Sequence, residues 1–399
     1  MFDHLNTPSF FPATRAHGQA RLKTFVPQMG KAYAQGRNRD LGPEDRRHVS
    51  CLSPFLRHRL ITEEEVLQTT LAHYSYDAAQ KFIQEVYWRG YFKGWLEARP
   101  WVWIYYQQAV EKQAKSLSGY QSKTYAQAIE GQTEIECFNA WTKELLETGY
   151  LHNHARMWYA SIWIFTLQLP WVLGADFFYR HLLDGDAASN TLSWRWVAGL
   201  HTKGKNYIAR ADNIRKYTGS RFSPTGQLAE DPAPLEDDWN GEAVAFQAPF
   251  PMLPTEKPLL VLHEEDLGVE TLPLTSTPVA VAIYSDPSRR STLPVSSLVK
   301  SFTAEAVAGT AARAQEKWSV PVKSVSSLHE IEEMKGEVGA KTLIMPYAPQ
   351  GPVQDALAPL QADILLRDYD QRVWPYCDKG FFKLKKKIEK LLPSNAIDL

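Results

Sequence analysis

The spacing of apolar and polar residues divides the chain into two regions. Over residues 1–222 apolar residues recur at helical spacing, as Phe82 and Val86 do, and this pattern predicts a mainly helical domain. From Pro258 onward, short continuous apolar runs alternate with helical stretches, an order that predicts a parallel α/β sheet. We therefore expect an all-helical domain that is followed by an α/β domain over residues 257–399.

Start and stop signals place individual helices in the first region. Thr62, followed three residues later by Glu65, forms a capping box, which predicts a helix start at this point. The next helix should end before Pro100, because proline lacks a backbone N–H and its ring clashes with the preceding turn. Residues 136–147 and 153–169 predict two further helices, and the second should be buried because it is apolar on nearly every side.

Four short apolar runs in the second region predict strands, and they lie at residues 259–262, 279–283, 343–345 and, more weakly, 364–366. Helical stretches separate them, notably at residues 295–318 and 353–360. Strands that alternate with helices predict a Rossmann-like parallel sheet. No glycine-rich dinucleotide-binding pattern and no phosphate loop follows any of these strands. The pattern therefore predicts the fold of this region without assigning it a ligand.

Between the two regions lies a segment with the composition of a linker. Residues 223–256 contain six prolines and an excess of acidic residues. Proline favours extended backbone and like charges repel one another, so such a segment is typical of a linker. We therefore predict three parts, which are a helical domain over 1–222, an acidic linker over 223–256 and an α/β domain over 257–399.

Composition narrows the class of protein. The chain has 399 residues, of which 44% are hydrophobic and 22% charged, values typical of a soluble protein with two or three domains. Cys51, Cys137 and Cys377 are too far apart to form a zinc site or a disulfide framework, and we predict no metal site. The first residues lack a signal-peptide pattern, and the apolar stretch 157–173 is too short and interrupted to span a bilayer. We expect a cytoplasmic monomer with no membrane contact.

The distribution of charge is more informative than its sum. A net charge of −1 argues neither for nor against a nucleic-acid partner. Residues 203–221, however, contain six lysines or arginines against a single acid, Asp212. A second basic run lies at residues 383–390. Because basic clusters are often only solvated surfaces, these two segments permit nucleic-acid binding without establishing it.

The residues that carry chemistry are concentrated in the second half of the helical region. Ten of the 13 tryptophans lie between Trp88 and Trp196. Asn153, Arg156 and Met157 follow one another at i, i+3 and i+4, so one helix face presents an amide, a guanidinium and a thioether together. Charged groups in such aromatic surroundings need partners, because an unpaired buried charge is costly.

Two nearby carboxylates, Asp184 and Asp186, are the candidate partners of Arg156. Arg156 and one of them can form a bidentate pair, while the other accepts hydrogen bonds from a ligand. Two interpretations remain open on these residues alone. The pair is either a structural salt bridge or one wall of a pocket for a large, polar, planar ligand.

The spacing of these residues resembles that in the flavin domain of the photolyase–cryptochrome family. The motif is Gly149-aromatic-x-His-Asn-x-x-Arg-Met, followed by Asp184-Gly-Asp-x3-Asn-x3-Trp-x-Trp. Upstream, in the family's order, lie further matches: Tyr33 with Arg37-Asn38-Arg39, the loop Ser50-Cys51-Leu52-Ser53-Pro54-Phe55-Leu56, and Glu85-x-x-Trp88-Arg89. The resemblance covers roughly residues 30–222, and five ordered motifs are a specific signal.

The resemblance implies a U-shaped FAD. The cofactor-binding residues that it implies are Tyr33, Ser50, Cys51, Leu52, Ser53, Phe82, Glu85, Arg89, Asn153, Arg156, Asp184, Asp186 and Asn190. The hydroxyls of Ser50 and Ser53, together with backbone N–H groups near a helix start, would hold the pyrophosphate. Asn190 would lie opposite the flavin N5, as in the DNA-repairing members of the family.

The same resemblance implies a deoxyribodipyrimidine photo-lyase. In this reaction the excited reduced flavin gives one electron to a pyrimidine dimer in UV-damaged DNA, which splits and returns it. The implied catalytic residues are Glu85, Trp88, Asn153, Met157 and Trp196, with Trp194 and Trp171 for photoreduction of the flavin. The two indoles that face the lesion would stack on a flipped-out dimer. Enzymes specific for (6–4) photoproducts typically carry histidine where Asn153 and Met157 stand, so we expect cyclobutane dimers as substrate.

Several positions depart from the family's pattern. Val49 replaces the usual threonine, Tyr150 the usual tryptophan and Asn139 the usual aspartate. The outermost tryptophan of the photoreduction chain is missing, and Ser118 and Tyr120 lie near its place. The segment after Trp196 also differs, and its added basic residues can replace the missing phosphate contacts; these are Lys203, Lys205 and Arg210.

The order of the domains differs as well. The family places an α/β antenna domain before the flavin domain, whereas the α/β region of this chain follows it. Residues 260–267 are similar to the family's opening strand and turn, so we expect an antenna-like domain and leave its second chromophore open. The moved domain and the altered segment 203–221 favour an alternative, a cryptochrome-like blue-light receptor that signals through protein partners. A degenerate flavoprotein is disfavoured because the pocket residues are largely intact.

Overall fold

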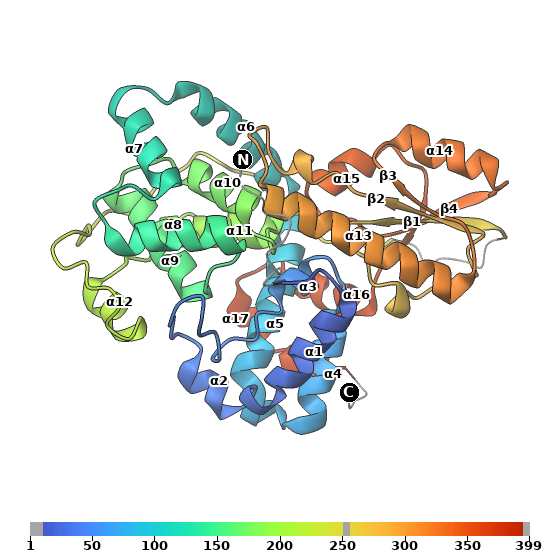
Figure 1. Ribbon diagram of the computed structural model, residues 1–399, viewed down its shortest axis with the longest axis horizontal. Helices are drawn as coiled ribbons and strands as arrows, with labels where there is room; N and C mark the ends of the chain where they lie inside the picture. The colour runs from blue at the N-terminus through green and yellow to red at the C-terminus, as the bar shows by residue number, and fades with distance from the viewer. Residues whose placement is uncertain (1–10, 250–255, 394–399) are drawn as a thin grey trace.

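The computed structural model of the protein describes residues 11–249 and 256–393 and shows a helical part beside a five-stranded sheet (Figure 1). The helices of the first part are α1 Arg15–Phe25, α2 Lys31–Gly36, α3 Ser53–Arg57, α4 Glu63–His73, α5 Tyr76–Glu97, α6 Pro100–Ser116, α7 Gly119–Glu130, α8 Glu136–Thr148, α9 Asn153–Ser161, α10 Trp171–His181, α11 Ala187–Ala198 and α12 Ala211–Tyr217. Short 3-10 or π-helical turns lie at η1 Val26–Gln28 and η2 Ile162–Thr166.

The second part alternates strands and helices as its apolar pattern predicts. Its strands are β1 Pro258–His263, β2 Ala280–Tyr284, β3 Val322–Val325, β4 Thr342–Pro346 and β5 Asp363–Leu365. Its helices are α13 Ser297–Trp318, α14 Leu328–Glu337, α15 Pro352–Leu357, α16 Asp368–Val373 and α17 Phe381–Lys385, with 3-10 turns at η3 Val269–Thr271, η4 Pro287–Arg290, η5 Trp374–Tyr376 and η6 Ile388–Leu391.

Local signals in the sequence account for several helix ends. The Thr62 hydroxyl accepts a hydrogen bond from the backbone N–H of Glu65, whose carboxylate accepts one from the N–H of Thr62, so the predicted capping box is confirmed. α5 ends at Glu97 before Pro100, as expected. The helix predicted over 153–169 is wrong in its extent, because α9 ends at Ser161 and continues only as a π-helical turn.

The sheet has the strand order β3-β2-β1-β4-β5, and all neighbouring strands are parallel. Leu260 and Leu262 of β1 face α13, whereas Leu259 and Val261 face α14 and α15. Figure 1 shows α13 and α14 on opposite sides of the sheet. Burial on both faces explains why β1 is a continuous apolar run rather than an alternating one.

Four of the strands lie where the apolar runs predict them, and β3 was missed. Lys323 and Ser324 in β3 are exposed, because this strand lies at the edge of the sheet. An edge strand with polar side chains carries no continuous apolar run, so the pattern used to find the other strands cannot detect it.

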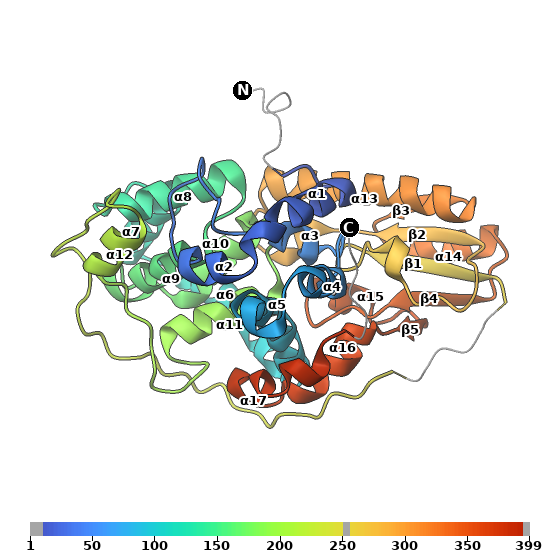
Figure 2. The same cartoon turned by 90° about the horizontal axis from the view of Figure 1, so that it is seen from below.

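After β5 the chain leaves the sheet and returns to the helical part. α16, η5, α17 and η6 pack along α5, as Figure 2 shows for α16 and α17. Their buried side chains include Trp374, Phe381 and Leu384, which share one core with Tyr87 and Tyr91 of α5. The C-terminal residues therefore complete the helical part although they follow the sheet in sequence.

The predicted linker contains no helix or strand within residues 223–249, and it lies against the helical part. The backbone N–H of Leu235 donates to Ala198 O at 2.9 Å, and that of Val244 donates to Ala98 O at 2.8 Å. No helix within residues 11–249 and 256–393 is long and apolar enough to cross a membrane.

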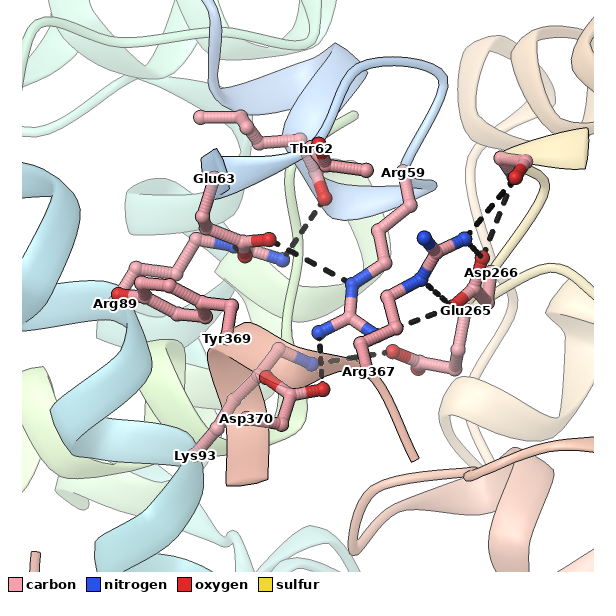
Figure 3. A network of polar contacts seen from close by, with 12 residues as sticks. Arg59, Thr62, Glu63, Arg89, Lys93, Glu265, Asp266, Arg367, Tyr369 and Asp370 are labelled. Carbon is pink, nitrogen blue, oxygen red and sulfur yellow. Dashed lines mark hydrogen bonds and ion pairs between the residues drawn. The ribbon is translucent and has the colours of Figure 1, made fainter. Parts of the chain in front are cut away.

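A buried cluster of charges joins the sheet to the helical part (Figure 3). Asp266, in the turn after β1, accepts two hydrogen bonds of 2.6 Å from Arg367 and one of 3.1 Å from Arg59. Arg59 also donates to Asp370 at 2.6 Å. Burial opposes ionisation of Asp266, but the two guanidiniums outweigh it and hold its pKa well below the ordinary range. These side chains are at most 8% exposed, so the cluster is a sealed interface.

Candidate flavin site

The centre of the candidate site is the ion pair between Arg156 on α9 and Asp184 before α11. The two guanidinium nitrogens donate to the two carboxylate oxygens at 3.0 and 2.8 Å, which confirms the bidentate geometry. Arg156 Nε donates to Leu151 O at 3.0 Å, and the Ser53 hydroxyl donates to Asp184. The pair therefore ties α3, α9 and the start of α11 together at the place that the sequence predicts.

Asp186 begins α11 and lies in a strongly positive environment. Its side chain accepts a hydrogen bond from Ser189 N at 2.7 Å, and Lys93 of α5 lies 2.8 Å away. Burial raises the pKa of Asp186, but Lys93, Arg89 and Arg57 lower it further, so the net pKa lies far below the ordinary range. Asp186 is thus a permanent anion whose main partner is Lys93, a residue that sequence reasoning did not select.

Asn190 follows Asp186 by one helical turn and is held in a single orientation. Its side-chain amide donates to Ala175 O at 2.7 Å, which leaves the side-chain oxygen as the group available to a ligand. Behind it, Trp194 packs so closely on Gly174 that any larger residue at that position would clash with the indole. α10 and α11 can approach each other here only because position 174 is glycine.

The opposite wall comes from α2 and α5. The rings of Tyr33 and Phe82 are in edge-to-face contact at 5.2 Å. One turn beyond Phe82, Glu85 pairs with Arg37 at 2.6 Å. Burial raises the pKa of Glu85, and the nearby Arg37 only partly offsets this.

Glu85 and Arg156 are both recessed and accessible to water. The Glu85 side chain is 33% exposed and that of Arg156 is 23% exposed. Desolvation is nevertheless the largest influence on the pKa of each group, which means that protein surrounds them on most sides. We refer to these two partly exposed ion pairs, Arg37–Glu85 and Arg156–Asp184, together with the side chains of α2, α5 and α9 around them, as the recess.

The loop before α3 offers donors to an anionic ligand. Cys51 has a φ of 52°, the left-handed region, and this turn leads directly into α3. Within the described residues, the backbone N–H groups of Cys51, Leu52 and Ser53 have no hydrogen-bond acceptor. Unpaired N–H groups in such a turn suit phosphate oxygens.

The residues present fit FAD. The loop would supply donors to a diphosphate, and the Arg156–Asp184 pair would supply charged groups to a planar ring. Arg89 pairs with Glu63 at 3.0 Å, donates to Leu56 O at 3.3 Å and lies 3.7 Å from Asp186; its contact with the cofactor remains a prediction. No group of three or more metal-ligating side chains is found among the described residues.

The residues expected to face the lesion lie in different environments. Asn153 is exposed at the start of α9, and Met157 is half-buried one turn later. Trp196 is half-buried and stacks on Tyr207 with ring centres 5.6 Å apart. Trp88 stacks on a residue of the chain itself, which is treated next.

The indole of Trp88 is covered by Phe381 of α17. The ring centres are 3.6 Å apart and the planes differ by 13°. One face of the expected lesion platform is therefore occupied by the C-terminal part of the chain. Nothing in the local sequence signals this contact, because α17 returns to α5 only after the whole sheet has been formed.

The two predicted photoreduction residues also have neighbours that the sequence did not reveal. Trp194 contacts Trp163 and Phe178, and no ring contact joins it directly to Trp171 within the described chain. Trp171 lies 5.6 Å from Trp239 of the linker. Trp239 in turn lies 5.8 Å from the ring of Tyr105, an exposed residue of α6. The linker thus supplies an aromatic ring beside Trp171.

Comparisons with known proteins find similarity over much of the helical part. Residues 82–237 match the family model described as the FAD binding domain of DNA photolyase. The deoxyribodipyrimidine photo-lyase of Vibrio cholerae is 25% identical over 215 residues, which cover 53% of this chain and 44% of that protein. The cryptochrome DASH of Idiomarina loihiensis is 26% identical over 210 residues, which cover 52% and 45% respectively.

Among solved structures, the cryptochrome of Synechocystis sp. PCC6803 is 23% identical and covers 55% of this chain and 46% of its own, with a TM-score of 0.45. The chain spans less than half the length of these relatives. The family model covers α5 from Phe82 onward and all of α9 and α11, but not α2. Residues 82–237 therefore match the FAD-binding domain of DNA photolyase, and over this part the chain is similar to members of the photolyase/cryptochrome family.

Proposed function

We propose that the protein is a deoxyribodipyrimidine photo-lyase that repairs cyclobutane pyrimidine dimers in DNA with light. The observation that carries this proposal is the arrangement of α9. Arg156 lines the recess, while Asn153 and Met157 on the same helix are exposed and half-buried. A ligand that covers the recess can therefore contact Asn153 and Met157 while it lies against the cofactor.

Bound FAD in its reduced form would supply, under blue light, the electron that splits the dimer. The residues of the chain position the reacting groups and exclude water. The Asn190 side-chain oxygen is free to contact the cofactor ring, since its amide is held by Ala175 O. The half-buried Trp196, which stacks on Tyr207 with one face, is the indole that would stack on the flipped-out bases. Lys203, Lys205 and Arg210 are exposed and suited to bind phosphates.

A second candidate function is a blue-light receptor that signals through a protein partner. The stacking of Trp88 on Phe381 favours it, because a pyrimidine dimer would have to displace Phe381 to reach that indole face. A displaced C-terminal segment would in turn be a signal that a partner protein can recognise.

We also propose that the α/β domain predicted over 257–399, up to the point after β5 where the chain returns to the helical part, corresponds to the family's antenna domain. The turn after β1 connects it to the flavin domain: Arg57 Nε donates to Gly185 O at 2.5 Å, and its Nη2 lies 2.7 Å from Glu265. Gly185 separates Asp184 from Asp186, so the sheet is attached directly behind the recess.

Repair of a defined lesion tests the leading proposal. Purified protein with chemically reduced flavin is mixed with an oligonucleotide that holds one cyclobutane thymine dimer, and thymine absorbance is followed under blue light. We expect recovery in the light, none in the dark and none on a (6–4) substrate. Absence of recovery on both substrates, with FAD bound and photoactive, would reject the enzyme and favour the receptor.

A further inference from the structure

The C-terminal segment has one apolar face and one basic face. Its buried residues recur at helical spacing against α5; they are Phe381, Leu384, Ile388 and Leu391. The remaining face carries exposed lysines, which are Lys379, Lys383, Lys386, Lys387 and Lys390. In the part of the chain that the structure describes, none of these five lysines forms an ion pair. The only acids between residues 375 and 392 are Asp378 and Glu389.

Two aromatic residues lie among these lysines at the surface. Phe382 is 73% exposed, although its neighbour Phe381 is buried. Tyr376 is 38% exposed, and the Lys387 ammonium lies 4.8 Å from its ring centre. Among the described residues the exposed Phe382 ring has one aromatic contact, an edge contact with Phe381 at 6.4 Å between ring centres. Aromatic rings interleaved with cations are, however, the combination that binds nucleic acid through stacking and phosphate contacts.

The C-terminal segment packs on aromatic side chains of α5. One of these side chains also contacts the loop that follows α11 and carries Lys203 and Lys205. The ring centre of Phe381 lies 3.6 Å from that of Trp88 and 5.5 Å from that of Tyr91. Tyr91 also contacts His201, with ring centres 6.1 Å apart. His201 precedes the exposed Lys203 and Lys205. Two lysine-bearing segments that are far apart in sequence therefore meet at one face of α5.

We propose that the C-terminal segment 376–390 is part of the DNA-binding surface, where its lysines contact the phosphates that flank the lesion and Phe382 stacks on a base. This inference rests on the proposed repair function, which makes DNA the partner. Charge complementarity supports it, because the five lysines form no ion pair among the described residues and Phe381 of their segment contacts Tyr91, which also contacts His201 beside the loop of Lys203 and Lys205. Contacts of this kind set affinity and position on the duplex without reading its sequence.

Fluorescence anisotropy of a labelled duplex with one thymine dimer, measured with the full chain over a range of salt concentrations, tests the inference. The variant is Lys383→Ala/Lys386→Ala/Lys387→Ala, and the control with equal charge change is Lys112→Ala/Lys300→Ala/Lys323→Ala, three exposed lysines elsewhere. We expect the variant to bind roughly tenfold more weakly or worse. The plot of log binding constant against log salt concentration has a negative slope, and its magnitude should decrease by about 2 to 3. Each lost phosphate contact reduces this magnitude by about 0.9.

Phe382→Ala separates stacking from charge. It should weaken binding by about fivefold or more while the salt slope stays unchanged, because a base stacked on an aromatic ring contributes no counterion release. Flavin absorbance of every variant, measured beside the anisotropy, reports that the flavin domain is folded.

The outcomes separate the inference from the function on which it rests. If the wild type binds dimer DNA and the lysine variant keeps its affinity and slope, or the control loses as much, the inference is overturned and the repair proposal stands. If the wild type binds neither damaged nor undamaged DNA at low salt, both fail. Binding to anionic lipid vesicles without DNA binding would likewise overturn the inference and assign the lysines to a membrane surface.

Discussion

The recess and the domain interface are built from the same chemistry and differ in their contact with water. In the recess, Arg156 and Glu85 are 23% and 33% exposed. In the interface, the side chains of Arg59, Asp266 and Arg367 are at most 8% exposed. Both regions pair guanidinium groups with carboxylates at 2.6 to 3.1 Å.

The difference in exposed fraction indicates which ion pairs stabilise the fold and which are available to a ligand. A sealed pair has already exchanged its water for protein partners, so removal of one member leaves a buried charge that nothing can solvate. A recessed pair keeps water on one side and can exchange that water for a cofactor. Exposure, more than residue type or distance, therefore distinguishes the flavin site from the structural cluster that lies behind it.

Removal of Asp266 should have the largest effect on stability. Asp266→Ala would leave Arg59 and Arg367 buried without their common partner, and we expect a loss of about 3–5 kcal/mol in the free energy of unfolding. Urea unfolding followed by circular dichroism measures it. Asp363→Ala, at an exposed position of β5, is the matched control. A loss below about 1 kcal/mol for Asp266→Ala would show that the cluster does not hold the domains together.

Glu97 sharpens the comparison, because it is an interface acid that forms no ion pair with the cations of residues 11–249 and 256–393, although Lys93 is near enough to lower its pKa slightly. It accepts hydrogen bonds of 2.7 Å from Tyr347 Oη and Gln350 N. Burial raises its pKa to about 7. The folded protein therefore holds a proton that the unfolded chain loses near its ordinary pKa of about 4.3, so stability should fall as pH rises through this window and remain lower above pH 7.

The expected pH-dependent loss for Glu97 is at most about 4 kcal/mol, because the pKa values of the folded and unfolded states differ and each tenfold change in proton affinity corresponds to about 1.4 kcal/mol. Glu97→Gln keeps both hydrogen bonds and removes the titration, so the variant should be more stable than the wild type at pH 8 and equal to it near pH 4.5. Urea unfolding at several pH values measures the difference. Parallel pH profiles for the two proteins would contradict the role given to Glu97.

Substitution of Glu85 should have the opposite effect to substitution of an interface residue: it should change the repair rate more than the stability. Because the Arg37–Glu85 pair is about one-third exposed, Glu85→Gln should change the free energy of unfolding by only about 0.2–1 kcal/mol. Repair of the thymine dimer should nevertheless slow severalfold, since Glu85 lines the recess. The two readouts are urea unfolding and light-driven recovery of thymine absorbance. A variant that is strongly destabilised and repairs normally would place Glu85 with the structural pairs.

Substitution of Trp239 should leave stability and cofactor content nearly unchanged. It should slow only the transfer of electrons to the flavin. Trp239→Phe removes the indole 5.6 Å from Trp171. We expect flavin photoreduction with an external reductant to slow severalfold, as seen in the bleaching of oxidised-flavin absorbance under blue light. Trp318→Phe, in α13 of the other domain, is the control. Equal rates for both variants would remove Trp239 from the route.

Sequence patterns predicted whatever depended on local spacing. The Arg156–Asp184 pair, the capping box at Thr62 and the strand β1 all follow from residues close together or from continuous burial, and the family and its FAD were recognised from ordered motifs of this kind. The assignment of individual residues to cofactor and lesion remains a prediction.

Contacts between distant segments could not be predicted. Lys93 of α5 pairs with Asp186 at the start of α11, far away in the sequence. A lysine within an aromatic stretch does not indicate which acidic residue it will pair with. Phe381 reaches Trp88 only because the chain returns to α5 after the sheet. Trp239 lies in a segment whose proline content predicts a linker, and its packing on Trp171 depends on where that linker runs.

One pair of conservative variants tests the central distinction most directly. Arg156→Lys and Arg59→Lys each keep the charge and remove the bidentate fork. Flavin content per folded chain and urea unfolding of the apoprotein are measured for both. We expect Arg156→Lys to lose flavin with little change in apoprotein stability, and Arg59→Lys to lose stability while the folded fraction keeps its flavin. The reverse outcome, or equal effects of both variants on both quantities, would contradict the account.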